Sequence, residues 1–211
     1  FIKNMKIKSL LRYFSKRKIG EGWDYVVFQS YSNKNKVIKI LRPTWKHIWS
    51  RKMMPWRISE ILRVPMQKQM LETAEKLKDL IFFNGELFAN PRFIGTSYTQ
   101  DKLVTLREYI KHCSTIETKI ILKKYLEFQN KCWSIGVADL TFKFSGYGVT
   151  QGNEIVLLDL SRLTFDGGQI EELVRNKKWL RVLDTKLLQR PTREYFEEIS
   201  NESFSGSASF G

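Results

Sequence analysis

Residues 18–41 constrain the fold of this chain more than any other segment. Residues 25–28 (Tyr-Val-Val-Phe) are β-branched or aromatic, a polar turn follows at 32–35, and a second strand-like run occupies 37–41. This alternation predicts a β-hairpin. The Gly20-Glu21-Gly22 sequence in front of it predicts a tight turn, in which the absence of a Cβ lets the backbone approach a ligand.

Hydrophobic residues at helical spacing follow this β-rich start. The spacing predicts helices over 44–57, 66–83, 116–136, 166–179 and 193–199. Strand-like runs at 91–94 and 103–106, separated by a polar turn, and a hairpin over 148–158 interrupt them. We therefore expect an α+β fold, with an antiparallel sheet and helices in the first part and a mainly α-helical second part.

The amino-acid composition limits the classes of protein to which this chain can belong. With 42% hydrophobic residues the chain can bury a core, and no apolar run approaches the roughly 18 residues of a membrane-spanning helix. Two cysteines and two histidines give neither a disulfide framework nor a zinc site of usual spacing. We expect a soluble, cytoplasmic protein. Because the first residue is Phe rather than Met, we also expect it to be a piece of a longer chain.

The positive charge is concentrated in residues 1–59, which hold 15 Lys and Arg against Glu21 and Asp24. Such a segment attracts anionic ligands or partners, and nucleic acid is one of them. Trp45, Trp49 and Trp56 lie among these basic residues and would offer stacking surfaces to single-stranded bases. The alternatives are an amphipathic helix that buries its tryptophans and a basic surface that serves solubility.

Three further residues complete a set that suits phosphoryl transfer. This reaction needs backbone amides near the nucleotide phosphates, a lysine to fix them, acidic ligands for Mg²⁺ and a carboxylate near the acceptor hydroxyl. Lys39 follows Gly22 by 17 residues on a predicted strand, and Asp159 follows Asp139 by 20 residues at the end of another. The order and spacing of these residues favour a nucleotide-dependent enzyme.

In these residues the chain resembles the protein-kinase-like superfamily, and in particular its aminoglycoside and small-molecule phosphotransferase branch. The glycine loop of that branch often reads much like Gly20-Glu21-Gly22-Trp23-Asp24. The resemblance implies a two-lobed fold: an N-lobe over 1–106, a hinge at 107–110 and a small helical C-lobe over 111–202. It also implies that ATP and Mg²⁺ bind between the lobes. The low-complexity composition of residues 203–211 predicts a flexible tail.

The resemblance further implies roles for single residues. Asp139 would orient or deprotonate the acceptor hydroxyl, Lys39 would contact the phosphates, and Asp159 would bind the metal. Lys39 would pair with a helix glutamate, either Glu72 or Glu75, with Glu60 a weaker candidate. The remaining nucleotide-binding positions implied are Gly20, Gly22, Val27, Glu108 and Ile110.

Several positions depart from the family pattern. Val137 and Ala138 precede Asp139 in place of the usual histidine, and Phe144 stands where an asparagine is expected. Either Ser145 replaces that asparagine as a metal ligand, after a shift of one residue, or the second metal site is missing.

These departures leave three functions open. The first is an ATP- and Mg²⁺-dependent phosphotransferase acting on a hydroxyl acceptor, which the basic segment suggests is anionic. The second is a pseudokinase that binds nucleotide or regulates without transfer. The third is a basic nucleic-acid-binding protein that uses residues 1–59.

Overall fold

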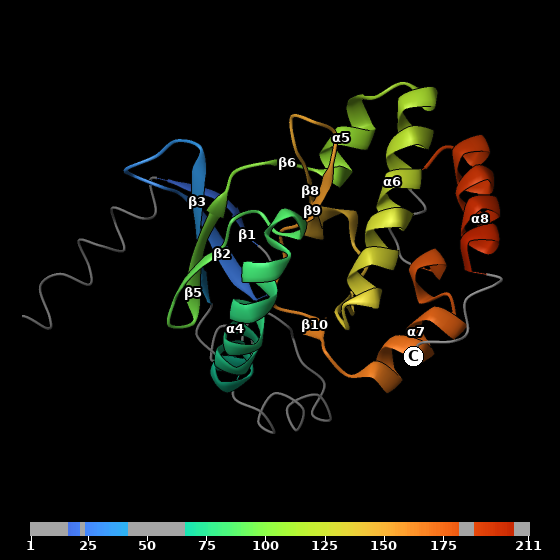
Figure 1. Ribbon diagram of the computed structural model, residues 1–211. Helices are drawn as coiled ribbons and strands as arrows, with labels where there is room; N and C mark the ends of the chain where they lie inside the picture. Colours follow the sequence, from blue (N-terminus) through green and yellow to red (C-terminus); the bar gives the residue numbers. More distant parts are fainter. Residues whose placement is uncertain (1–16, 22–23, 42–65, 182–187, 205–211) are drawn as a thin grey trace, which may run out of the picture. The chain divides into compact units, whose positions relative to one another are not determined.

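The computed structural model describes residues 17–21, 24–41, 66–181 and 188–204, and Figure 1 shows their helices and strands. The chain divides into two compact units. Unit 1 takes in the described residues up to Phe83 together with Asn90–Lys102, and unit 2 comprises Asn84–Ala89 and the described residues from Leu103 onward. The result is a mixed α+β protein with a five-stranded antiparallel sheet.

The sheet of unit 1 has the strand order β1-β2-β3-β5-β4 and is antiparallel throughout. Its strands are β1 (Lys18–Glu21), β2 (Tyr25–Gln29), β3 (Lys36–Leu41), β4 (Arg92–Ile94) and β5 (Ser97–Asp101). The predicted hairpin is confirmed, because β2 pairs with β3 over its whole length. Aromatic contacts consolidate the sheet: the Tyr98 ring lies 5.3 Å from that of Tyr25 and 5.5 Å from that of Phe93.

The prediction of a polar turn between residues 94 and 103 is wrong. Residues 97–101 form β5, in which Tyr98 and Gln100 are buried while their neighbours are only half-buried. This alternation is that of a strand, but the polar residues Ser97, Thr99 and Gln100 hide it from a reading based on hydrophobicity. The run predicted over 103–106 shortens to β6 (Val104–Thr105), since Leu106 already belongs to a helix.

The helix predicted over 66–83 is confirmed as α4 (Met66–Phe83) in unit 1. Thr73, Ala74 and Leu77 are buried and follow each other at the spacing of one helix face. The helix predicted over 44–57 lies outside the described residues.

Unit 2 is built around the long helix α6 (Thr115–Ser134), which packs along α8 (Arg190–Phe204). Ser114 and Glu117 form a reciprocal capping box at its start. Gly136 at φ +74° follows its end, where the sequence predicts that the helix ends. The ring of Tyr125 on α6 contacts those of Tyr147, Phe144 and Phe196 at centroid distances of 5.0, 5.4 and 6.3 Å. These contacts hold the segment 144–147 against the helix.

Shorter elements complete unit 2. The helix predicted over 166–179 is α7 (Gly167–Arg175), capped by Asp166 as expected, and it ends early because Lys177 adopts φ +45°. The other elements are α5 (Leu106–His112), η2 (Gly85–Leu87), η3 (Phe144–Gly146), η4 (Lys178–Arg181), β7 (Ala138–Asp139), β8 (Tyr147–Val149), β9 (Ile155–Leu157) and β10 (Leu163–Thr164). The predicted hairpin is β8–β9, with β6 beside β8, and β7 pairs with β10.

Among the helices that the structure describes, none is both long and apolar enough to cross a membrane.

Candidate functional site

Two aspartates predicted to act together lie on either side of one glycine in unit 2. Asp139 ends β7 and Asp159 follows β9. A Cβ placed on Gly146 would lie 3.6 Å from Asp139 Oδ2 and 3.5 Å from Asp159 Cβ. The fold therefore brings together two carboxylates that are 20 residues apart in sequence.

Backbone hydrogen bonds fix the positions of both aspartates. The carbonyl of Gly146 accepts hydrogen bonds from the amides of Leu158 at 2.8 Å and Asp159 at 3.0 Å. Asp139 is paired with Leu163 of β10, and the amide of the next residue, Leu140, donates to the Arg162 carbonyl at 2.8 Å.

Asp139 is buried, with 3% of its surface exposed, and its carboxylate has a defined set of donors. Its Oδ1 accepts hydrogen bonds from the Thr141 amide at 2.8 Å and the Thr141 hydroxyl at 2.9 Å, and Oδ2 accepts one from the Tyr147 hydroxyl at 2.8 Å. Burial and, as the smallest contribution, the charge of Asp159 raise the pKa of Asp139 to about 6 against the opposing effect of these donors. A carboxylate with such a pKa can take up and release a proton near neutral pH.

Asp159 is half-buried and is held through one oxygen. Its Oδ1 accepts hydrogen bonds from the Ser161 hydroxyl at 2.7 Å and the Ser161 amide at 3.1 Å. Within the part of the chain that the structure describes, Oδ2 accepts no hydrogen bond. This leaves one carboxylate oxygen of Asp159 that a cation could use.

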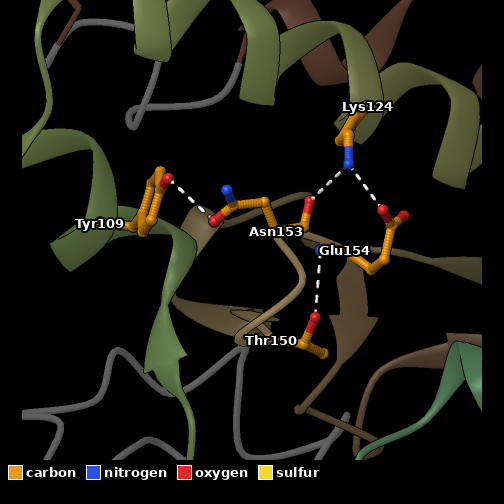
Figure 2. A network of polar contacts seen from close by, with 5 residues as sticks. All are labelled: Tyr109, Lys124, Thr150, Asn153 and Glu154. Atoms are coloured by element: carbon orange, nitrogen blue, oxygen red, sulfur yellow. Dashed lines mark hydrogen bonds and ion pairs between the residues drawn. The ribbon is translucent and has the colours of Figure 1, made fainter.

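Polar contacts fix the far end of the β8–β9 hairpin, whose second strand leads to Asp159 (Figure 2). The Tyr109 hydroxyl on α5 donates to Asn153 Oδ1 at 3.1 Å. Lys124 on α6 donates to the Asn153 carbonyl at 3.0 Å and forms an ion pair with Glu154 at 2.6 Å. Within the turn, the Glu154 amide donates to Thr150 Oγ1 at 3.1 Å. Two helices thus anchor the turn of the hairpin.

The surroundings of Phe144 and Ser145 differ from what the family pattern implies. Phe144 is buried among aromatic rings, and Ser145, the predicted metal ligand, is exposed on η3. Gly146, two residues after Phe144, is the residue next to both aspartates: a Cβ on it would lie near Asp139 Oδ2 and Asp159 Cβ.

Sequence reasoning missed Gly146 and the donors Thr141 and Tyr147. Thr141 follows Asp139 by two residues, which is the spacing of a side chain that bonds to a nearby backbone amide. The Gly146-Tyr147-Gly148 sequence directly before the predicted strand was the remaining signal, since a glycine there allows close approach.

In unit 1, three of the predicted nucleotide-binding residues lie in one row across the sheet. Gly20 of β1 is opposite Val27 of β2, Val27 is opposite Lys39 of β3, and Lys39 is opposite Tyr98 of β5. Directly opposed residues of an antiparallel sheet present their side chains on the same face. Lys39 is buried, and its Nζ lies 5.4 Å from the centroid of the Tyr98 ring, within the range of a cation–π contact.

The two predicted partners of Lys39, Glu72 and Glu75, are exposed on α4. Glu75 forms an ion pair with Lys78 at 2.7 Å. Gly22 and Glu60 lie outside the described residues, as do Trp45, Trp49 and Trp56 of the suggested nucleic-acid surface.

The predicted hinge residues 107–110 form part of a helix, α5, which Thr105 caps by accepting a hydrogen bond from the Glu108 amide at 3.2 Å. Inside a helix the amide of a residue such as Ile110 bonds to the carbonyl four residues earlier. The backbone of Glu108 and Ile110 is thus engaged by the helix and its cap, which differs from the expectation that it faces adenine.

The described residues contain no cluster of three or more His, Cys, Asp or Glu side chains that could enclose a metal. Two neighbouring carboxylates nevertheless fit Mg²⁺, which usually binds through one or two carboxylates, substrate phosphates and water. Asp159 is the residue that would hold it, because both oxygens of Asp139 already accept hydrogen bonds from Thr141 and Tyr147.

No family model matches this chain, and no curated protein matches it. Among solved structures, it is similar to that of Rv3197 in complex with erythromycin, from Mycobacterium tuberculosis, with a TM-score of 0.43 and 13% sequence identity. The match covers 84% of this chain and 53% of that protein, so the chain spans about half of the other's length. This similarity is too distant to assign a family or a function.

Proposed function

We propose that the chain is an ATP- and Mg²⁺-dependent phosphotransferase of kinase-like, two-lobed architecture that transfers the γ-phosphate to a hydroxyl acceptor. The observation that carries the proposal is the placement of Asp139 and Asp159 on either side of Gly146. The row that joins Gly20, Val27 and Lys39 supports it, because it gives the sheet of unit 1 a buried ammonium group.

Each residue then has a distinct role. Mg²⁺, when bound, neutralises charge on the phosphate oxygens. Asp159 holds the cation through the carboxylate oxygen that Ser161 does not occupy, and Lys39 contacts a phosphate oxygen. Asp139 accepts the proton of the acceptor hydroxyl, while Thr141 and Tyr147 orient its carboxylate. With a pKa of about 6, Asp139 is mostly ionised at neutral pH and is still basic enough to accept the proton of the hydroxyl group.

The test is transfer from γ-labelled ATP with Mg²⁺, measured as hydrolysis, autophosphorylation and incorporation into a pool of hydroxyl compounds that includes anionic sugars. We expect Asp159→Asn and Lys39→Met each to lower the rate by about 100-fold or more, because each removes charge stabilisation. Glu127→Gln, an exchange of an exposed carboxylate on α6, serves as the matched control. Absence of all three signals in the unaltered chain would reject the proposal.

A second candidate is a nucleotide-binding module without transfer activity, a pseudokinase. Gly146 favours it, since glycine supplies no oxygen ligand at the position between the two carboxylates. Thermal stabilisation by ATP separates the two candidates. Stabilisation that requires Mg²⁺ supports the enzyme, and equal stabilisation with EDTA supports the module.

A further inference from the structure

Unit 2 contains a cavity of about 190 Å³ that the proposed chemistry does not use. It lies among α5, the start of α6, η3 and the start of α8. Its polar lining consists of Arg107, Lys111, Thr115, Thr118, Gln189 and Thr192. Basic side chains, an amide and hydroxyls are thus gathered around one small space.

The charged side chains known to line this cavity are both basic. They are Arg107 and Lys111, and no carboxylate among the residues that the structure describes lines the cavity. Of the two nearest acidic residues along the chain, Glu108 forms an ion pair with Lys111 at 2.7 Å, and Glu117 accepts hydrogen bonds from Ser114 in the capping box of α6. Glu108 therefore partly neutralises Lys111, and the positive charge at the cavity comes chiefly from Arg107.

Arg107 is the strongest single indication of an anion. Its Nε is buried and has no hydrogen-bond partner among the described residues. A buried donor without a partner costs free energy, which a bound acceptor would recover. A guanidinium matches phosphate and carboxylate oxygens with two parallel hydrogen bonds.

The apolar lining and the volume of the cavity limit the size of the ligand that it can hold. Ile110, Phe144 and Leu188 are apolar and lower the local dielectric, so they strengthen a charge–charge contact. Pockets for drug-sized ligands measure about 300–1,000 Å³, so a cavity of about 190 Å³ suits a smaller molecule. A complete nucleotide does not fit these dimensions, which separates this cavity from the proposed ATP site.

We infer that this cavity binds a small phosphate-bearing anion, either inorganic phosphate or a short phosphomonoester, with Arg107 as its principal contact and Lys111 as a supporting charge. Nothing in this inference depends on the proposed phosphotransferase activity, and its test uses no nucleotide.

Cys113 lines the cavity and provides the readout. The test measures its alkylation by neutral iodoacetamide, peptide by peptide, in inorganic phosphate, in glycerol 3-phosphate and in potassium chloride of equal ionic strength. Cys132 is an internal control, since it is buried and burial raises its pKa to about 12. We expect about 10 mM of a binding anion to slow alkylation of Cys113 at least about threefold relative to chloride. The phosphate compound that protects at lower concentration identifies the source.

Variants assign the effect to the cavity. Arg107→Gln is expected to abolish protection, and Lys111→Gln is expected to raise the protecting concentration at least about threefold. Lys123→Gln, which removes an exposed charge on α6, is the control and keeps the protection of the unaltered chain. Equal alkylation in phosphate and chloride overturns the inference, as does unchanged protection in Arg107→Gln. If Arg107→Gln does not fold, an unchanged protecting concentration in Lys111→Gln overturns it.

Discussion

Replacing Asp139 by asparagine should stabilise the folded protein at neutral pH while it removes transfer activity. Asparagine reproduces the uncharged form of the buried carboxyl group and keeps its hydrogen bonds. Its Oδ1 can accept from the Thr141 amide and hydroxyl, and its amide group can donate to the Tyr147 oxygen. The substitution therefore removes a buried charge while the side chain keeps its contacts with Thr141 and Tyr147.

The magnitude follows from the pKa of Asp139. Burial raises this pKa from 3.8 to about 6, so the folded state binds the proton more tightly than the unfolded state. The stabilisation from protonation is complete below about pH 4 and is lost as the pH rises to about 6. At about 1.4 kcal/mol per pKa unit, ionised Asp139 lowers the free energy of unfolding at pH 7 by about 1–3 kcal/mol.

Thermal unfolding of the unaltered chain and of Asp139→Asn, at several pH values from 4 to 7.5, tests this reasoning. At pH 7 the variant should melt about 3–10 °C higher, given about 2–4 °C per kcal/mol for a chain of this size. The difference should shrink toward pH 4, where both side chains are uncharged. Comparing the two proteins cancels the other titrating groups. An equal or lower melting temperature for the variant at pH 7, or a difference independent of pH, would refute the account of Asp139.

Three other substitutions test separate parts of the structure. Gly148→Ala should lower the free energy of unfolding by about 1–3 kcal/mol in urea denaturation, because its Cβ would meet two leucine side chains at 3.1 Å. Gly85→Ala is the control, since a Cβ there enters open space and should change the free energy of unfolding little. Ser114→Ala removes the capping box of α6 and should cost about 1 kcal/mol by the same measurement; an unchanged stability would mean that the cap contributes nothing. A Cβ at Gly146 would make ordinary contacts of 3.5–3.6 Å, and Gly146→Asn would add an amide oxygen near the two aspartates, so thermal stabilisation by Mg²⁺-ATP should increase; no change would argue against a cation there.

The sequence was most informative where local patterns coincide with burial. The hairpin over β2 and β3 and the long helix α6 are confirmed, because β-branched runs, apolar residues at helical spacing and a terminal glycine are local signals that coincide with burial.

The differences have identifiable physical causes. Strand β5 carries polar residues at positions that pair with β3, so hydrophobic periodicity does not reveal it. The Thr105-Leu106-Arg107-Glu108 sequence has the spacing of a helix cap, which explains why residues expected in a hinge form α5.

The proximity of Gly146 to the two aspartates could not be predicted from the sequence. It depends on how Phe144 is drawn into the aromatic contacts of Tyr125, which sets the path of the loop between the two aspartates. A contact between residues so far apart is a property of the packed core and leaves no local pattern.

Calorimetric titration of ATP into the full chain, with Mg²⁺ and with EDTA, tests the central claim most directly when it is repeated on Asp159→Asn. The claim predicts that binding requires Mg²⁺ and that Asp159→Asn weakens it at least about tenfold, a change of about 1.4 kcal/mol. Absence of binding under both conditions, or equal affinity for the unaltered chain and the variant, would contradict it.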